Sequence, residues 1–401
     1  MQFRIRYSPR KMALPQKPLI YLNNAATSWP KPPEVLSAIT ESLSLPVFGS
    51  GRTTGTQGED YVTLARERVS EFLGTKNPEN IIFTENATDS LNILIAGFLA
   101  GQQNTCRVLT TALDHNSVLR PLHEHQHAGR IKLDTLPFTD GIVSPKTIED
   151  ALTPDTKLMV MTHGSNVLGS LQNIQAIGKI LQDHGVFFIV DGAQTAGHIP
   201  ISLSDLPLDA FVFTGHKGLL GISGTGGFYL KNPDKVAPVK FGGTGTNSQS
   251  LLHPRSMPEK FEAGTHNHTG LAALAAGVKF VQEKGITTIE EQAKKQTSAI
   301  IQALAKEENI TIHNHHPDLP VISFNILGLH NDDVGFILAR AYNIIVRTGL
   351  HCAPLVHEII DGGEGSVRLS LSCFTTDEEC RTAAEAILEV AENANSTIHS
   401  A

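Results

Sequence analysis

A carboxylate and a lysine each end an apolar segment in the middle of the chain. Asp191 ends FFIVD, and Lys217 ends DAFVFTGHK. Both segments are typical of buried strands, and ligand-binding groups of α/β sheets gather at the carboxyl ends of strands, so we expect both side chains in one crevice. A lysine can form a Schiff base with a carbonyl cofactor, and a carboxylate can keep a pyridine nitrogen protonated. The pair predicts a pyridoxal 5'-phosphate (PLP) site, with the cofactor on Lys217.

Residues beside Lys217 are suited to binding the cofactor's phosphate. Thr214 and His216 can donate hydrogen bonds to it, and the glycine-rich run that follows allows a close approach of the backbone. Taken alone, Lys217 has a simpler explanation as a surface lysine in a turn, and Asp191 as a helix cap. Their combination with His216 and Gln194 favours the cofactor site.

The elements expected to position these residues alternate between strands and helices. The strands are predicted at Ile81–Thr84, Arg107–Thr110, Leu158–Thr162, Phe187–Val190 and Ala210–Thr214. Helices are predicted at Ala87–Ala100, Ser117–His125 and Asn173–His184. This alternation predicts an α/β fold with a mostly parallel sheet covered on both faces.

The pattern changes after Gly264. An Ala/Leu-rich helix at 269–282 and a long polar helix at about 287–307 precede shorter alternating segments and a final helix at 377–393. We therefore expect an N-terminal arm (1–20) that packs on the small domain, a large PLP-binding domain (21–284) and a smaller α+β domain (285–401).

Composition narrows the classes of partner. The chain has 401 residues, 40% of them hydrophobic, and a net charge of -8 without a dense Lys/Arg run, which disfavours nucleic acid as a partner. No segment approaches the roughly 20 apolar residues of a membrane-spanning helix. The basic first residues lack the apolar core of a secretory signal, so an arm is favoured over a transit peptide. The four cysteines form no CxxC pair, so we expect no metal site and reduced thiols in the cytoplasm.

The motifs DGAQ and TGHK, in that order, resemble fold-type I PLP enzymes of the class V aminotransferase group. Within this group the chain is most similar to cysteine desulfurases and selenocysteine lyases, from Tyr21 to about Thr376. The segment FTENATDSLN resembles the phosphate-binding turn, where Ala87 and Thr88 would open a helix whose positive end faces the phosphate. An ordinary helix cap at Asn86 or Thr88 is the alternative explanation of this segment.

Further motifs imply contacts around the cofactor ring. LDHNSVLRPL resembles the motif in which an imidazole stacks on the ring, which is the role implied for His115, with proton transfer as a second role. Asn166 in SNVLG and Gln194 in DGAQ are implied to contact the phenolic oxygen, although both amides could instead satisfy buried backbone. FEAGT implies that Thr265 reaches the phosphate bound by the other subunit of a homodimer.

The substrate side is implied by three other segments. Arg368 in SVRLSLSCFTT would bind the substrate carboxylate through two parallel hydrogen bonds. Asn24 belongs to the first active-site motif, YLNNAATSWP. RTGLHCAPL resembles the loop of the persulfide-forming cysteine, Cys352, with Arg347 and His351 as cations that could stabilise its thiolate.

The resemblance implies that L-cysteine is converted to L-alanine, with a persulfide on Cys352 that passes to an acceptor. The short loop before Cys352 places the chain with the second group of the family, which often needs an acceptor protein. Selenocysteine lyase activity, an aminotransferase or other PLP lyase, and a non-catalytic scaffold stay open as alternatives, as does Cys352 as a plain buried thiol. The other cysteines, Cys106, Cys373 and Cys380, are expected to be structural.

The chain departs from the family's pattern at a few positions. GSGRTTGTQGEDY matches an arginine-containing loop at Arg52, but Thr54 and Gly55 replace the histidine that often follows. The first motif has Asn23 where many relatives have aspartate. These departures leave open a substrate other than plain cysteine.

Overall fold

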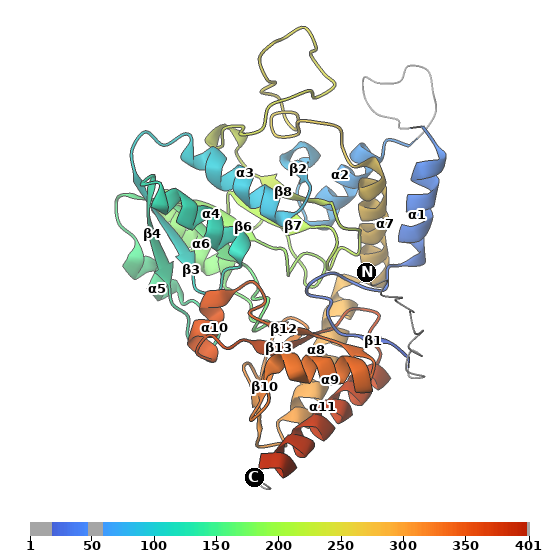
Figure 1. Cartoon of the computed structure of the whole chain (residues 1–401). Coiled ribbons are helices and arrows are strands. Elements are labelled where there is room, and N and C mark those ends of the chain that lie inside the picture. The colour runs from blue at the N-terminus through green and yellow to red at the C-terminus, as the bar shows by residue number, and fades with distance from the viewer. Residues whose placement is uncertain (1–17, 47–58, 399–401) are drawn as a thin grey trace, which may run out of the picture.

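A seven-stranded sheet forms the centre of the larger part of the molecule (Figure 1). The computed structural model describes residues 18–46 and 59–398. The strand order is β2-β8-β7-β6-β5-β3-β4, and only β8 runs against its neighbours, which confirms the mostly parallel sheet. The strands are β2 (Ile81–Thr84), β3 (Cys106–Thr111), β4 (Ile131–Leu136), β5 (Thr156–Thr162), β6 (Phe187–Asp191), β7 (Ala210–Thr214) and β8 (Gly226–Leu230).

Helices cover both faces of this sheet. Alternate residues of the buried strands point to opposite faces, so that Phe187 and Ile189 pack in one core cluster and Phe188 and Val190 in another. The first cluster is closed by α3 (Ala87–Leu99) and α4 (Asn116–His127). The second is closed by α2 (Tyr61–Phe72), α5 (Pro145–Ala151), α6 (Ile174–Asp183) and α7 (His268–Lys284). Helix α1 (Pro33–Ser44) lies against α7.

The smaller part has a sheet and a core of its own. Its four antiparallel strands have the order β12-β13-β10-β9, and an apolar cluster lies between this sheet and its helices. These strands are β9 (Ile310–Ile312), β10 (Val321–Ile326), β12 (Arg347–Gly349) and β13 (Ser366–Ser370). Its helices are α8 (Ile286–Leu304), α9 (Asn331–Ala341) and α11 (Asp377–Ile398).

Two segments link the parts. Near the start of the described chain, β1 (Ile20–Tyr21) pairs with β11 (Ile344–Ile345), and Leu22 packs in the small core. In the opposite direction, the short helix α10 (Pro354–Ile360) leaves the small part, and Val356 packs in the core of the large one. The division near residue 285 stays a prediction. The packing of residues 1–20 also stays a prediction, because residues 1–17 lie outside the described part of the chain.

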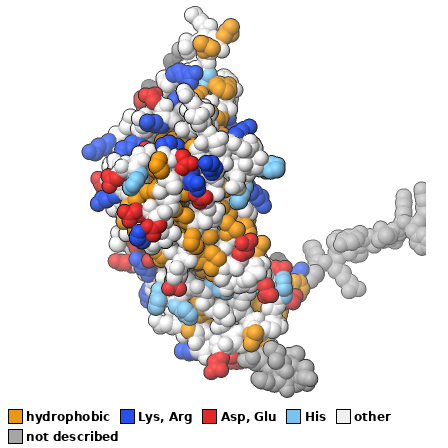
Figure 2. Space-filling view, turned by 90° about the vertical axis from the view of Figure 1, so that its left-hand side faces the viewer, with side chains coloured by type: hydrophobic (Ala, Val, Ile, Leu, Met, Phe, Trp, Pro, Cys, Tyr) orange, Lys and Arg blue, Asp and Glu red, His pale blue; other side chains and the backbone are white. Residues whose placement is uncertain are grey.

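The surface carries mixed charge. Figure 2 faces the side on which α4, α5 and α10 lie in Figure 1, and basic and acidic side chains alternate over its upper part, with hydrophobic side chains gathered near the middle. Within the described residues, no helix is long and apolar enough to cross a membrane.

Candidate active site

A cavity of about 210 Å³ lies beyond the carboxyl ends of the parallel strands. Strands β5, β6 and β7 end there at Thr162, Asp191 and Thr214, and the amino end of α3 faces it. It brings together most of the residues predicted from sequence, namely Ala87, Thr88, His115, Asn166, Asp191, Gln194, Thr214, His216, Lys217, Arg347, His351 and Arg368.

Asp191 is a buried carboxylate, 4% exposed, with few hydrogen bonds. Ala193 N–H donates to its Oδ1 at 3.0 Å, and this is the only hydrogen bond that the side chain accepts from the described residues. Burial raises its pKa, and the Ala193 N–H and the positive charge of Lys217 oppose that rise. A carboxylate in this position is suited to pairing with a cationic ring nitrogen.

Lys217 is held by the backbone before it. The carbonyl oxygen of His216 accepts hydrogen bonds from Ser28 N–H at 2.9 Å, from Ser28 Oγ at 3.0 Å and from Lys31 Nζ at 3.3 Å. Burial lowers the pKa of Lys217 to about 8 against the opposing effect of Asp191, and Arg368 lowers it further. A neutral, nucleophilic amine is therefore accessible close to neutral pH.

His115 caps the amino end of α4. Ser117 N–H donates to its Nδ1 at 3.0 Å, so the proton of the neutral ring resides on Nε2. Burial, together with the charge of Lys217, lowers its pKa to about 4. His216 is also kept neutral, because burial and the charge of Lys217 lower its pKa to about 4, and its buried Nδ1 has no hydrogen-bond partner in the described chain.

Asp114 fixes the strand ends beneath His115 and was not predicted. It is fully buried and accepts from Thr111 N–H at 2.7 Å and from Thr162 N–H at 2.6 Å, which ties β3 to β5. Burial raises its pKa to about 7 in spite of these bonds. Asp114 precedes His115 in the motif LDHN, and this position could have suggested it. Only the fold reveals that Asp114 joins two strands.

Arg368 is buried, at 1% exposure, in the middle of β13. Its Nη1 donates to Asn166 O at 2.9 Å and its Nη2 to Asn23 Oδ1 at 3.4 Å, while the buried Nε has no partner among the described residues. Burial, reinforced by Arg347, which is its cross-strand neighbour, lowers its pKa to about 9. Two adjacent guanidinium groups make this wall of the cavity suitable for a carboxylate.

Cys352 lies at the rim, in a loop tied to the large part. Arg347 Nη2 is 3.1 Å from its Sγ, and its carbonyl oxygen accepts from Asn116 N–H at 2.7 Å. His351 and Cys352 both have left-handed backbones, with φ of 49° and 60°, a costly conformation for residues other than glycine. Asn166 Nδ2 stabilises it by donating to His351 O at 2.8 Å.

His351 does not supply the expected positive charge. Its ring is 2% exposed, and burial lowers its pKa to about 2, so it is neutral beside Cys352. Its Nε2 is 3.1 Å from Ser366 O, so this nitrogen makes its contact within the small part and not with Cys352. Arg347 is the cation in contact with the thiol.

Besides Cys352, two predicted residues lie outside the cavity. Asn24 donates to Ser370 O at 2.9 Å and accepts from Trp29 N–H at 3.1 Å, so its buried amide joins the first motif to β13 instead of facing a substrate. Thr265 is exposed and lines a separate hollow with Glu262 and other residues of its loop. Its predicted contact with another subunit stays a prediction, and Arg52, Thr54 and Gly55 lie outside the described residues.

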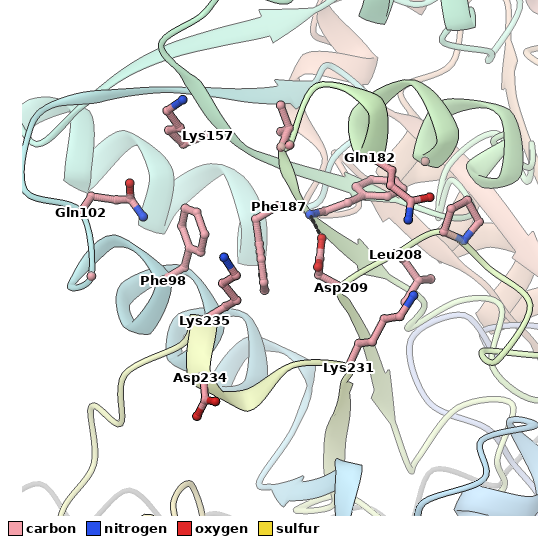
Figure 3. A pocket seen from close by; sticks show the side chains of 16 residues that line it. Phe98, Gln102, Lys157, Gln182, Phe187, Leu208, Asp209, Lys231, Asp234 and Lys235 are labelled. Carbon is pink, nitrogen blue, oxygen red and sulfur yellow. Dashed lines mark hydrogen bonds between the residues drawn. The ribbon is translucent and has the colours of Figure 1, made fainter.

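The remaining cysteines have the structural positions that were expected. All three are buried, and burial raises the pKa of Cys106 and Cys373, and that of Cys380 to about 12. Another hollow, of about 520 Å³, lies at the opposite ends of the strands, where Lys157, Asp209 and Lys231 surround it (Figure 3). It contains none of the predicted site residues and faces the amino ends of the strands.

Comparison with known proteins identifies the family. The aminotransferase class-V family profile matches residues 20–382. The chain belongs to this family. It is 31% identical to a probable cysteine desulfurase of Halalkalibacterium halodurans over 90% of each chain, and 31% identical to one of Methanothermobacter thermautotrophicus over 93% of this chain and 94% of the relative.

Solved structures give the same picture. The apo structure of a cysteine desulfurase from Thermococcus onnurineus NA1 superposes with a TM-score of 0.85 at 31% identity, over 94% of this chain and 95% of the other. The cysteine desulfurase CsdA of Escherichia coli, in an S-sulfonic acid form, superposes with a TM-score of 0.83 at 25% identity, over 93% and 95%. These likenesses confirm the fold and the family predicted from the motifs.

Proposed function

We propose that this chain is a PLP-dependent cysteine desulfurase that converts L-cysteine to L-alanine and collects the sulfur as a persulfide on Cys352. The observation that carries the proposal is the 3.1 Å contact between Arg347 Nη2 and Cys352 Sγ, at the rim of the cavity that contains Lys217 and Asp191. The relatives named cysteine desulfurases support it.

The side chains of the cavity fit PLP. Lys217 would hold the cofactor covalently, Asp191 would pair with its ring nitrogen, and the unpartnered Nδ1 of His216 is suited to the phosphate together with the amino end of α3. When bound, PLP supplies an electron sink for the charge that develops at the substrate α-carbon.

Three side chains of the protein have separate roles in the proposed reaction. Arg368, with its unpartnered Nε, binds the substrate carboxylate, and Lys217 in its neutral form moves a proton at the α-carbon. The thiolate of Cys352 attacks the substrate sulfur. A new S–S bond forms as the Cβ–S bond breaks, and the carbon takes up a proton to leave as alanine. Cysteine and the enzyme thiol thus become alanine and an enzyme persulfide, with no outside oxidant.

One experiment tests reaction and nucleophile together. The holoenzyme is incubated with L-cysteine without reductant, alanine is quantified, and the peptide that contains Cys352 is analysed by mass spectrometry. We expect one added sulfur on Cys352, and a Cys352→Ser variant that retains the cofactor spectrum without forming persulfide. Alanine production with an unmodified Cys352 would contradict the proposal, and so would borohydride reduction that leaves Lys217 unlabelled.

We further propose that the protein acts in the cytoplasm as a homodimer in which Thr265 completes the partner's phosphate site. Thr265 is exposed and does not line the cavity of its own chain, which is in keeping with this arrangement. Sedimentation of the holoenzyme tests the oligomeric state, and a monomer that is fully active would contradict it.

A further inference from the structure

A surface groove of about 570 Å³ starts at Cys352 and follows the exposed side of α4. Thr88, His115 and Ser117 line both this groove and the inner cavity, so the two hollows adjoin at the amino end of α4. Cys352 itself lines the groove, whereas Arg347, which contacts its Sγ, lines the inner cavity. The thiol therefore separates an internal compartment from an external one.

The inner cavity leaves no room for a macromolecular acceptor. Its volume is about 210 Å³, and its lining is the set of residues proposed to hold cofactor and substrate. Nor is Cys352 free to swing outward, because Asn116 N–H holds its carbonyl oxygen at 2.7 Å and the next residue, Ala353, is fully buried in the large core. The sulfur has to be collected in place, from the groove.

The groove is lined by more basic than acidic side chains. Arg120 and Arg130 line it and are exposed, and neither has an ion-pair partner among residues 18–46 and 59–398. Glu124 is the single acidic residue of its lining, and burial lowers the pKa of His125, which keeps that ring neutral. Arg66, Arg107 and Arg381, by contrast, are paired with the acidic residues Glu262, Asp134 and Glu378.

We propose that this groove binds an extended, acidic segment of a sulfur-acceptor protein whose cysteine reaches Cys352. The inference rests on the proposed function. Along α4, at 1.5 Å per residue, Arg120 lies about 6 Å from the amino end that adjoins Cys352. Arg130 follows the end of the helix, and its Nη1 lies 3.5 Å from Nδ1 of His125, a residue about 14 Å along α4. An extended chain advances about 3.3 Å per residue, so the acidic residues belong about two and about four positions from the acceptor cysteine.

The transfer is an exchange between sulfur atoms. The acceptor thiolate attacks the outer sulfur of the Cys352 persulfide, a new S–S bond forms, and the old S–S bond breaks. Cys352 leaves as a thiolate, beside the guanidinium of Arg347, and the acceptor carries the persulfide. No net oxidation occurs, and the enzyme is returned to its starting state.

Three peptides of equal length test the groove. Each has one cysteine, and the residues two and four positions away are both Glu, both Gln or both Lys. Holoenzyme loaded by a single turnover with L-cysteine is mixed with each peptide, and mass spectrometry follows the loss of sulfur from Cys352 and its gain by the peptide. At low salt we expect the Glu peptide to react about tenfold faster than the Gln peptide and the Lys peptide to be slowest, with the differences shrinking in high salt.

Charge variants localise the effect. In the double variant Arg120→Gln/Arg130→Gln the advantage of the Glu peptide should disappear, while the first-turnover persulfide forms as in the wild type. Arg340→Gln is the matched control, because Arg340 is an exposed arginine of α9 outside the groove, and it should keep the full preference. Arg120→Glu/Arg130→Glu should reverse the order of the peptides.

Equal rates for the three peptides, or a preference that survives the double variant, would overturn the groove proposal and leave the desulfurase assignment standing. Failure of wild-type Cys352 to acquire sulfur at all would instead overturn the proposed function, and this inference with it.

Discussion

Replacing Arg66 by methionine removes the cation from a buried ion pair that anchors the loop before α7. Arg66 donates to both carboxylate oxygens of Glu262, at 2.9 and 2.8 Å, and the two side chains are 10% and 3% exposed. Glu262 also accepts from Phe83 N–H at 2.7 Å and lies 3.2 Å from His266 Nε2. The pair thus joins α2, β2 and the segment that leads to Thr265.

The expected cost follows from burial. Removing one member of a buried ion pair leaves an uncompensated charge, and such changes cost about 3–5 kcal/mol. We therefore expect Arg66→Met to lower the free energy of unfolding by about that amount. Adding Glu262→Gln should restore part of the loss, because the remaining charge is gone and the glutamine oxygen still accepts from Phe83 N–H.

Urea unfolding followed by circular dichroism, at fixed enzyme and cofactor concentration, measures these differences. Arg68→Met is the matched control, since Arg68 donates to a single carbonyl, that of Ala275 at 3.0 Å, and the same substitution there should cost clearly less. A loss below about 1 kcal/mol for Arg66→Met, or a double variant that is less stable than the single one, would refute the reasoning.

The pH dependence has a definite sign. Burial pushes the pKa of Glu262 up, but the hydrogen bond from His266 and the guanidinium of Arg66 outweigh it, so the pKa lies below its ordinary 4.5. A depressed carboxyl pKa stabilises the folded state above the unfolded value of 4.5 and ceases to do so as the pH falls through the folded value. The difference between wild type and Arg66→Met should therefore shrink below about pH 4.5.

Three other predictions concern the active site. The rate at which the apoenzyme takes up PLP, followed by absorbance, should rise with a midpoint near pH 8, and a midpoint near 10.5 would contradict the lowered pKa of Lys217. Arg347→Gln should slow alkylation of Cys352 by iodoacetamide about tenfold, because the thiolate loses a charge-assisted contact, and an unchanged rate would show that Arg347 does not activate it. If Thr265 acts across the interface, a mixed dimer of an inactive Lys217→Ala subunit and a weakened Thr265→Ala subunit should contain one fully intact site. Mixing the two variants should then recover activity as subunits exchange. No recovery would place Thr265 in its own subunit's site.

Most strands of the large part could be predicted from sequence because they are short and apolar throughout. The five predicted strands all form, within one or two residues of the expected ends, whereas β4 and β8 were missed. β4 is an edge strand with the polar sequence IKLDTL, half open to solvent, so its apolar pattern is weak. β8 begins with two glycines, a pattern that is typical of a loop. At Gly227 the fold has no room for a side chain, because a Cβ there would lie 2.3 Å from Ile82 O.

For the site, the motifs predicted which residues meet but not what surrounds them. His351 was expected to be a cation, and its complete burial, which no local pattern announces, makes it neutral. The role of Asn24 depended on Ser370, and the support of Lys217 depends on Ser28 and Lys31, all of them far away in sequence. Partners of this kind become visible only when the chain is folded.

The position of Cys352 shows why the two parts of the molecule must act together. Its loop leaves the small sheet at Gly349, receives a hydrogen bond from Asn116 of α4, and continues into α10, whose Val356 is buried in the large core. Arg368, two strand residues beyond Ser366, comes from the same small sheet and contacts Asn166 of the large part. Asn166 contacts both segments, because its Nδ2 donates to His351 O and its carbonyl oxygen accepts from Arg368 Nη1. The proposed nucleophile and the proposed substrate-binding arginine are thus held against the large part through one residue. We infer that in the proposed reaction this packing, and not loop motion, sets the distance between the substrate carboxylate and the Cys352 sulfur, so that an acceptor has to come to Cys352.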